Sequence, residues 1–195
     1  MTRIIAGAAA RVSLAVPRSG TRPTSDRVRE ALFSALEARD ALDGARVLDL
    51  YAGSGALGLE ALSRGAVSAV LVERDATAAA LCRRNADAVL TALRASGDRT
   101  DHLPSPSVEV RAAAVDAFLR GAPGPFDLVF SDPPYGVADS VVAADLALLA
   151  PLLADGAVVV VERSSRSPAP AWPAGIRLEA VKKYGETALY VATTP

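Results

Sequence analysis

A short run of residues could hold an amino group by accepting its hydrogens. Asp132, Pro133, Pro134 and Tyr135 follow one another directly. The carboxylate of Asp132 and the carbonyl of Pro133 can each accept one N–H of an exocyclic amino group on a nucleobase. The prolines fix φ and make the loop stiff, and Tyr135 can stack on the base. This chemistry suits methyl transfer to nitrogen, although a simple turn that ends a strand would also use two prolines.

A glycine-rich turn is the second candidate site. Residues 49–58 read DLYAGSGALG and contain the pattern G-x-G-x-x-G between an expected strand and an expected helix. Gly53 and Gly55 permit unusual backbone angles and let a ligand approach without a Cβ in the way. Tyr51 and Ser54 lie in the same turn and join the candidate contacts. A tight strand-to-helix turn without a ligand remains the alternative.

Two acids narrow the choice of ligand for this turn. Asp49 comes just before it, where a phosphate would be repelled and a cationic amino or sulfonium group attracted. Glu73 ends the next expected strand, where a carboxylate can accept both hydroxyls of a ribose. The pair fits S-adenosylmethionine better than a pyrophosphate, and Arg74 beside Glu73 joins the candidate cofactor contacts. Helix capping by Asp49 and a solvated strand end at Glu73 are the alternatives.

Alternating strands and helices must position these residues. We expect strands at 47–51, 69–73, 108–111, 126–131 and 156–162, and helices at 56–63, 77–93, 116–119 and 139–149. Short apolar strands alternating with helices indicate an α/β, Rossmann-like fold whose mostly parallel sheet is covered on both faces. Runs 176–184 and 187–193 are joined by two residues and can pair only antiparallel, as a C-terminal hairpin. Both candidate motifs should then face one crevice at the carboxyl ends of the strands.

The first 45 residues follow a different pattern. Residues 3–16 suit a small hairpin around Gly7, and a helix should begin near residues 23–26, with apolar positions 28, 32, 33 and 36 on one face. We therefore expect a basic N-terminal hairpin extension over residues 1–22 and a Rossmann-like domain over residues 23–195.

Composition excludes several classes of protein. The chain of 195 residues has one cysteine, Cys82, and one histidine, His102, which argues against a disulfide and against a zinc site. We expect no metal. No apolar run approaches the ~18 residues needed to span a bilayer, and residues 1–5 do not resemble a signal peptide. A cytoplasmic protein with no membrane association is the expectation.

The net charge of −1 hides a separation of charge along the chain. Residues 1–30 hold six arginines against two acids, a net charge of +4, whereas the remaining 165 residues hold 15 basic and 20 acidic side chains, a net charge of −5. A cationic N-terminal segment beside an acidic sheet suits an enzyme that meets RNA phosphates with the first and a cofactor with the second.

Three longer stretches carry a resemblance to a known family. They are RII at residues 3–5, RPTSDRVREALF at residues 22–33 and LYAGSGALGLEALSRG at residues 50–65. Together with Asp49, Glu73 and the tetrapeptide 132–135, they resemble the RsmD family of class I S-adenosylmethionine-dependent methyltransferases, over nearly the whole chain. The resemblance implies methyl transfer to N2 of a guanine in 16S rRNA, within the small ribosomal subunit or its assembly intermediate, with S-adenosylhomocysteine as product. We expect a monomer.

The resemblance also implies roles for particular residues. Residues 132–135 would hold the target amino group, and Asp49, Gly53, Gly55 and Glu73 the cofactor. The acid or amide that touches the adenine in the family falls on Ala114 in this chain, so Asp116, two positions on, takes its place in our prediction. The expected RNA contacts are Arg3, Arg11, Arg18, Arg22, Thr24 and Arg27. The family usually has Gly-Arg where this chain has Arg11-Val12, which affects the expected RNA contacts of the hairpin.

Three other functions fit part of the pattern. An amino-methyltransferase acting on another RNA or DNA base shares the tetrapeptide, and the leading Asp132 only favours guanine. An NAD(P)-linked oxidoreductase would explain the glycine turn but leaves Asp49 and residues 132–135 without a role. A non-catalytic rRNA-binding assembly factor would use the basic N-terminal segment to bind RNA and would not transfer a methyl group.

Overall fold

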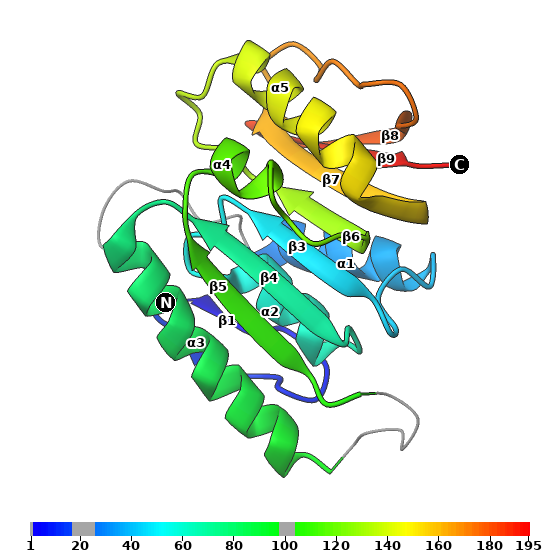
Figure 1. The fold of residues 1–195 in the computed structure, drawn as a ribbon. Helices are drawn as coiled ribbons and strands as arrows, with labels where there is room; N and C mark the ends of the chain where they lie inside the picture. The colour runs from blue at the N-terminus through cyan, green and yellow to red at the C-terminus, as the bar shows by residue number, and fades with distance from the viewer. Residues whose placement is uncertain (1, 17–25, 98–103) are drawn as a thin grey trace.

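A seven-stranded sheet with helices on both faces forms the centre of the molecule (Figure 1). The computed structural model describes residues 2–16, 26–97 and 104–195. The strands are β3 (Arg46–Leu50), β4 (Ser68–Glu73), β5 (Ser107–Ala112), β6 (Phe126–Ser131), β7 (Leu153–Ser164), β8 (Arg177–Tyr184) and β9 (Thr187–Thr193). Their order in the sheet is β5-β4-β3-β6-β7-β9-β8. The first five are parallel, and β9 pairs antiparallel with both β7 and β8. The predicted Rossmann-like fold and its C-terminal hairpin are confirmed.

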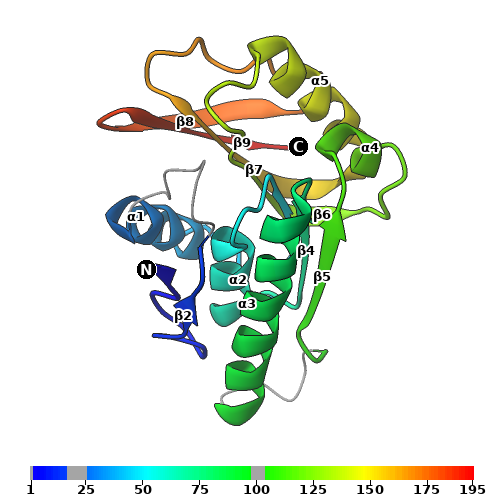
Figure 2. The ribbon, with the colours of Figure 1, turned by 90° about the vertical axis from the view of Figure 1, so that its left-hand side faces the viewer.

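The helices cover the sheet in two groups. They are α1 (Asp26–Glu37), α2 (Ala56–Ser63), α3 (Ala76–Ala95), α4 (Val115–Leu119), α5 (Asp139–Leu149) and the short 3-10 helix η1 (Ala150–Leu152). Figure 2 shows α1, α2 and α3 together on one face, with α4 and α5 on the other. Alternate residues of a strand point to opposite faces. Accordingly, Phe130 packs in the cluster with α1 to α3, and its neighbour Val129 packs in the cluster with α4 and α5. The central parallel strands β3, β4, β6 and β7 are therefore largely buried on both sides, whereas β5, at the edge of the sheet, is mostly exposed.

Most predicted boundaries lie within two residues of the observed ones, and β7 is the exception. It begins at Leu153 and continues to Ser164, whereas the sequence predicted residues 156–162. The pairing with β6 shifts register between Phe126 and Leu128, so that Leu153 pairs with Phe126 and Val158 with Leu128. This bulge lets the strand include Gly156, which has a positive φ of 71°.

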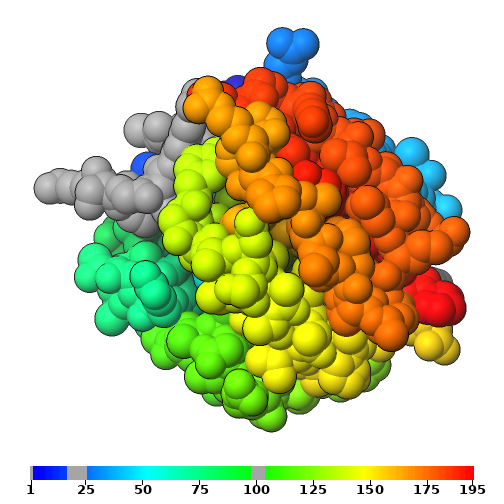
Figure 3. Space-filling model, turned by 90° about the horizontal axis from the view of Figure 1, so that it is seen from above, coloured from blue at the N-terminus to red at the C-terminus, as the bar shows by residue number. Residues whose placement is uncertain are grey.

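The segment 165–175 after β7 contains three prolines and no helix. Figure 3 shows this segment (orange) running beside α5 (yellow). Trp172 from the segment packs against the cluster that contains Val142 and Leu146 of α5. Trp172 thus adds to the apolar cluster between α5 and the sheet. None of the helices in residues 2–16, 26–97 and 104–195 is long and apolar enough to cross a membrane.

The N-terminal part forms a small hairpin and a helix, as predicted. Strands β1 (Thr2–Arg3) and β2 (Ser13–Leu14) pair antiparallel, with Gly7 between them at a φ of 82°. Helix α1 buries the four apolar positions that the periodicity indicated. The predicted helix start at residues 23–25 lies outside the described residues, as does His102.

Candidate active site

The two candidate motifs meet where the strand order reverses. From β3 the chain proceeds to β4 and β5 on one side, and it returns to place β6 on the other side of β3. In open α/β sheets, ligands bind at such a switch point, outside the carboxyl ends of the strands. The glycine turn follows β3 and the tetrapeptide 132–135 follows β6. Between them lies a cavity of about 560 Å³, a size typical of ligand pockets.

The structure brings nearly all the predicted cofactor and catalytic residues to this cavity. The residues that line it are Asp49, Tyr51, Gly53, Ser54, Glu73, Arg74, Asp116, Asp132, Pro133, Pro134 and Tyr135. Gly55 does not line the cavity. Ala114, the position where the family has an acid or amide, lines it together with Asp116.

The two glycines of the turn serve different purposes. Gly53 has a φ of 55°, and a Cβ there would meet no atom closer than the Tyr51 carbonyl oxygen at 4.0 Å. A ligand can therefore approach its backbone. Gly55 has a φ of 77°, and a Cβ there would lie 2.8 Å from the Cys82 sulfur. Gly55 is thus required by close packing behind the turn. Cys82 itself is buried, and burial raises the pKa of its thiol to about 12.

Asp49 caps a helix and faces the cavity at the same time. Its Oδ2 accepts a hydrogen bond of 3.0 Å from the backbone N–H of Gly58, in the first turn of α2. Burial raises the pKa of Asp49 to about 7; the Gly58 N–H opposes this shift and the charge of Glu73 adds to it. The alternative that Asp49 caps a helix is therefore confirmed. Because Asp49 also lines the cavity, capping does not exclude contact with a ligand.

Glu73 connects the end of β4 to the glycine turn. Its Oε2 accepts the N–H of Gly53 at 2.9 Å, and its Oε1 accepts the N–H of Asp75 at 2.8 Å. The side chain is half-buried and faces the cavity. Each carboxylate oxygen can accept more than one hydrogen bond. Glu73 can therefore hold the turn in place and still accept hydroxyl groups of a ligand.

Asp132 stands beside a second acid that the sequence analysis did not single out. Glu162, on β7, is 7% exposed and lines the same cavity. Loss of surrounding water raises the pKa of Asp132 well above its ordinary value, and the negative charges of Glu162 and Asp49 raise it further. The signal that could have identified Glu162 was present, since it ends the predicted strand 156–162, where an acid meets the crevice.

A third acid, Asp145, was also missed. It lies on α5, is 4% exposed, and accepts a hydrogen bond from the hydroxyl of Tyr51. Burial and this carboxylate both raise the pKa of the Tyr51 hydroxyl. Tyr51 adopts a positive φ of 62°, so the bond holds it in an uncommon conformation beside the cavity. An acid within an otherwise apolar helix was the available signal.

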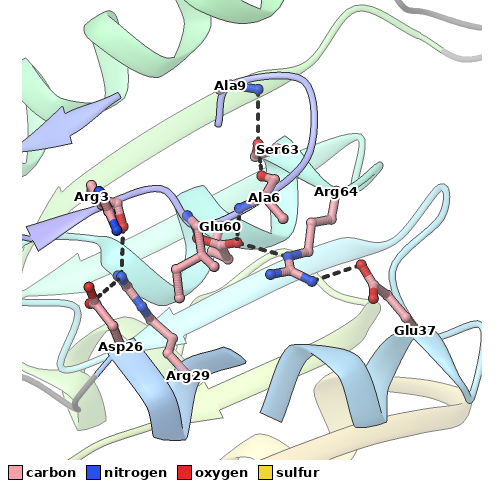
Figure 4. Close-up of polar contacts among 10 residues, drawn as sticks. Arg3, Ala6, Ala9, Asp26, Arg29, Glu37, Glu60, Ser63 and Arg64 are labelled. Atoms are coloured by element: carbon pink, nitrogen blue, oxygen red, sulfur yellow. Dashed lines mark hydrogen bonds and ion pairs between the residues drawn. The ribbon is translucent and has the colours of Figure 1, made fainter. Parts of the chain in front are cut away.

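The N-terminal arm, which we define as residues 2–16, is fastened to α2 (Figure 4). Glu60 of α2 is fully buried, and its carboxylate accepts the N–H groups of Ile5 at 2.7 Å and Ala6 at 3.0 Å. Arg64 donates to the same carboxylate at 2.8 Å. Ser63 accepts the N–H of Ala9 at 2.9 Å. The arm is therefore part of the folded body.

Arg29 joins this arm to the cavity wall. It is 1% exposed, and its Nη2 donates to the carbonyl of Arg3 at 2.6 Å and to Asp26 at 2.9 Å. Burial lowers the pKa of its guanidinium. Thr2 and Arg29 both line the cavity. The inclusion of Arg29 in a cationic surface was wrong, because its position on α1 turns it toward the core.

The predicted RNA contacts divide into two groups. Arg3, Arg11 and Arg27 are exposed. Arg18, Arg22 and Thr24 lie outside the described residues. Asn85 of α3 links the arm to the glycine turn, because its side chain bonds both backbone groups of Ala15 and the carbonyl of Ser54, each at 2.9 Å.

Comparison with known proteins identifies relatives over nearly the full length. Residues 2–193 match the family described as "Conserved hypothetical protein 95". The chain is 38% identical over 189 residues to "Ribosomal RNA small subunit methyltransferase D" of Escherichia coli K12, covering 95% of this chain and 86% of that protein. A solved E. coli structure superposes with a TM-score of 0.78 at 35% identity, covering 99% of this chain and 97% of the other. A hypothetical protein of Thermus thermophilus gives a TM-score of 0.77 at 32% identity, covering 98% of each chain.

Proposed function

Because this chain belongs to the RsmD family of ribosomal RNA methyltransferases, we propose that it methylates N2 of a guanine in 16S rRNA, with S-adenosylmethionine as the methyl donor. The observation that carries the proposal is the meeting of residues 132–135 with the acid-lined glycine turn in one cavity. The substrate would be the small subunit or its assembly intermediate, and the enzyme would act as a monomer.

The residues of the turn fit the proposed cofactor. The cofactor carries a positively charged amino group and a sulfonium, which suit a cavity whose wall includes Asp49. Gly53 leaves room for close approach to its backbone, and Glu73 has acceptor sites for ribose hydroxyls. Asp116 also lines the cavity, and we propose that it contacts the adenine.

Residues 132–135 would act on the target nitrogen. S-adenosylmethionine would supply the methyl group from its sulfonium, which becomes a neutral thioether. The target nitrogen would offer its lone pair to that methyl group and release one proton, to Asp132 or to water. Asp132 and the carbonyl of Pro133 would each accept one N–H, which draws the nitrogen toward tetrahedral geometry and exposes that lone pair. Tyr135 is 56% exposed and free to stack on a base turned out of its helix.

Transfer of a labelled methyl group tests the proposal. The protein is incubated with methyl-labelled S-adenosylmethionine and small subunits from a strain that lacks the modification, and the digested RNA is analysed for labelled nucleosides. We expect label in N2-methylguanosine. Label in a different nucleoside would overturn the base assignment, and no label would favour a non-catalytic binding protein. Calorimetric titration with S-adenosylhomocysteine and, separately, with NAD distinguishes a methyltransferase from an oxidoreductase.

A further inference from the structure

Strand register places Glu162 directly beside Asp132. The parallel strands β6 and β7 pair Ser131 with Val161, so the next residue along each strand is Asp132 and Glu162. Neighbouring strands lie about 4.8 Å apart. Two positions earlier, Phe130 and Val160 pair and both pack on the face covered by α1 to α3. By alternation, Glu162 points to that same face, and Asp132, just past the end of β6, lines the same cavity.

Glu162 is held from the side away from Asp132. The hydroxyl of Thr187, on β9, lies 3.4 Å from Oε1 of Glu162. Strand β9 pairs with β7 on the edge opposite to β6. The Glu162 side chain is 7% exposed, and it lines the cavity together with Asp132, Pro133 and Tyr135. A carboxylate has about four acceptor sites, so Glu162 can keep partners within the protein and still accept a donor from a ligand.

A second acceptor beside the amino-binding loop would distinguish the bases by their edges. Guanine carries an N1–H donor next to its N2 amino group. Adenine has an N1 lone pair next to its N6 amino group, and cytosine has an N3 lone pair next to its N4 amino group. A carboxylate at this neighbouring position therefore attracts guanine and repels the other two bases.

We infer that Glu162 accepts the N1–H of the target guanine while Asp132 and Pro133 hold its N2 amino group, and that Glu162 thereby selects guanine over adenine and cytosine. The inference rests on the proposed function, because it concerns the base that enters the same cavity. It assigns to β7 a recognition role that is separate from methyl transfer itself.

The base 2-aminopurine tests this role, because it keeps the C2 amino group and replaces N1–H by a lone pair. Once the methylated guanine has been mapped, RNA is prepared with guanine or 2-aminopurine at that position. We compare kcat/KM on the two RNAs for the wild type and for Glu162→Gln, whose amide can donate to the lone pair. The preference for guanine should fall roughly 10- to 100-fold in the variant, with binding of S-adenosylhomocysteine within about threefold of the wild type.

Two further variants keep the experiment decisive. Thr187→Val removes only the hydroxyl beside Glu162 and should lower the preference less, which provides an answer even if Glu162→Gln does not fold. Glu179→Gln, on β8 and paired with Arg39 at 2.6 Å, should leave the preference unchanged. If kcat/KM falls equally on both RNAs in Glu162→Gln, or the preference is unchanged in both Glu162→Gln and Thr187→Val, the inference is overturned while the proposed function stands. A wild-type protein that methylates no guanine overturns both.

Discussion

The buried acid Glu60 on α2 and the acids of the cavity wall differ in their hydrogen-bond partners. Glu60 receives two backbone N–H groups from the arm and the Arg64 guanidinium. Asp49 receives one backbone N–H, and in the described part of the chain neither Asp49 nor Asp132 has a basic side chain within ion-pair distance. Burial raises the pKa of both, and negative neighbours raise it further. The acid that connects two segments, Glu60, is surrounded by hydrogen-bond donors of the protein. Asp49 and Asp132, which face the cavity, have few such donors, and we expect a ligand to supply them.

This difference has an energetic consequence for the empty protein. The pKa of Asp49 is raised from 3.8 to about 7, a shift that corresponds to a cost of the order of 4 kcal/mol for ionised Asp49 in the fold. A cationic group in the cavity would offset part of this cost. The cavity acids therefore oppose stability and support binding, while Glu60 supports stability.

Removal of the Glu60 charge should give the largest effect on stability. Glu60→Gln removes the buried negative charge that pairs with Arg64. The amide N–H of the new side chain would also face the N–H donors that Glu60 now accepts. We expect the free energy of unfolding to fall by about 3–5 kcal/mol, measured by urea denaturation.

The matched control is the exposed partner of the same arginine. Glu37 bonds Arg64 at 2.8 Å, but its side chain is 51% exposed. Glu37→Gln should cost less than about 1 kcal/mol. Equal losses in the two variants would refute the view that burial and donor matching make Glu60 structural.

Neutralising Asp49 should have the opposite sign. In the wild type, the folded protein holds an extra proton between pH 4 and the raised pKa, about 7, so the free energy of unfolding falls as pH rises through this range. Asp49→Asn should lack this fall and be more stable than the wild type at pH 8, by about 2–4 kcal/mol. Its affinity for S-adenosylhomocysteine should be weaker.

An exposed aspartate provides the comparison for this measurement. Asp87, on the exposed face of α3, should behave as the wild type when changed to Asn. The distinction between cavity acids and structural acids fails if Asp49→Asn follows the wild-type pH profile of unfolding, or if it is destabilised at pH 8.

The pH dependence of methyl transfer gives a smaller effect. Because the pKa of Asp132 is raised, the carboxylate becomes protonated as pH falls through a range well above that of an ordinary aspartate. The rate should then drop by about tenfold per pH unit below that pKa. Asp132→Asn keeps an acceptor oxygen and cannot titrate, so its acid limb should be flat in single-turnover rates. If the fall in rate at low pH is unchanged in Asp132→Asn, the titrating group is not Asp132.

The fold could be predicted from the sequence because its central strands are short apolar runs that alternate with helices. Each buried run of β-branched residues stood between turn residues, and the two-residue turn at 185–186 allowed only antiparallel pairing. The extra length of β7 was not predictable in this way. Its first residues are paired through a bulge with β6, which depends on contacts between strands and leaves no periodic pattern in one of them.

The parts of the candidate site that lie in short continuous motifs could be predicted from the sequence. The parts that consist of single residues from separate elements could not. The glycine turn and the tetrapeptide 132–135 were found because each is continuous. Glu162 and Asp145 enter the cavity from separate elements, one residue at a time. Arg29 was counted as surface charge although it stands four residues before Phe33, on the buried face of α1; the helical period was the missed signal.

The most direct test of the central claim is the rate of methyl transfer by Asp132→Ala to small-subunit RNA at saturating S-adenosylmethionine. If Asp132 holds the target amino group, the rate should fall by about 10²–10³-fold, although the variant loses only an acid that opposes folding in the empty protein. Transfer at the wild-type rate would contradict the assignment of the amino group to this loop, and with it the role of the cavity acids.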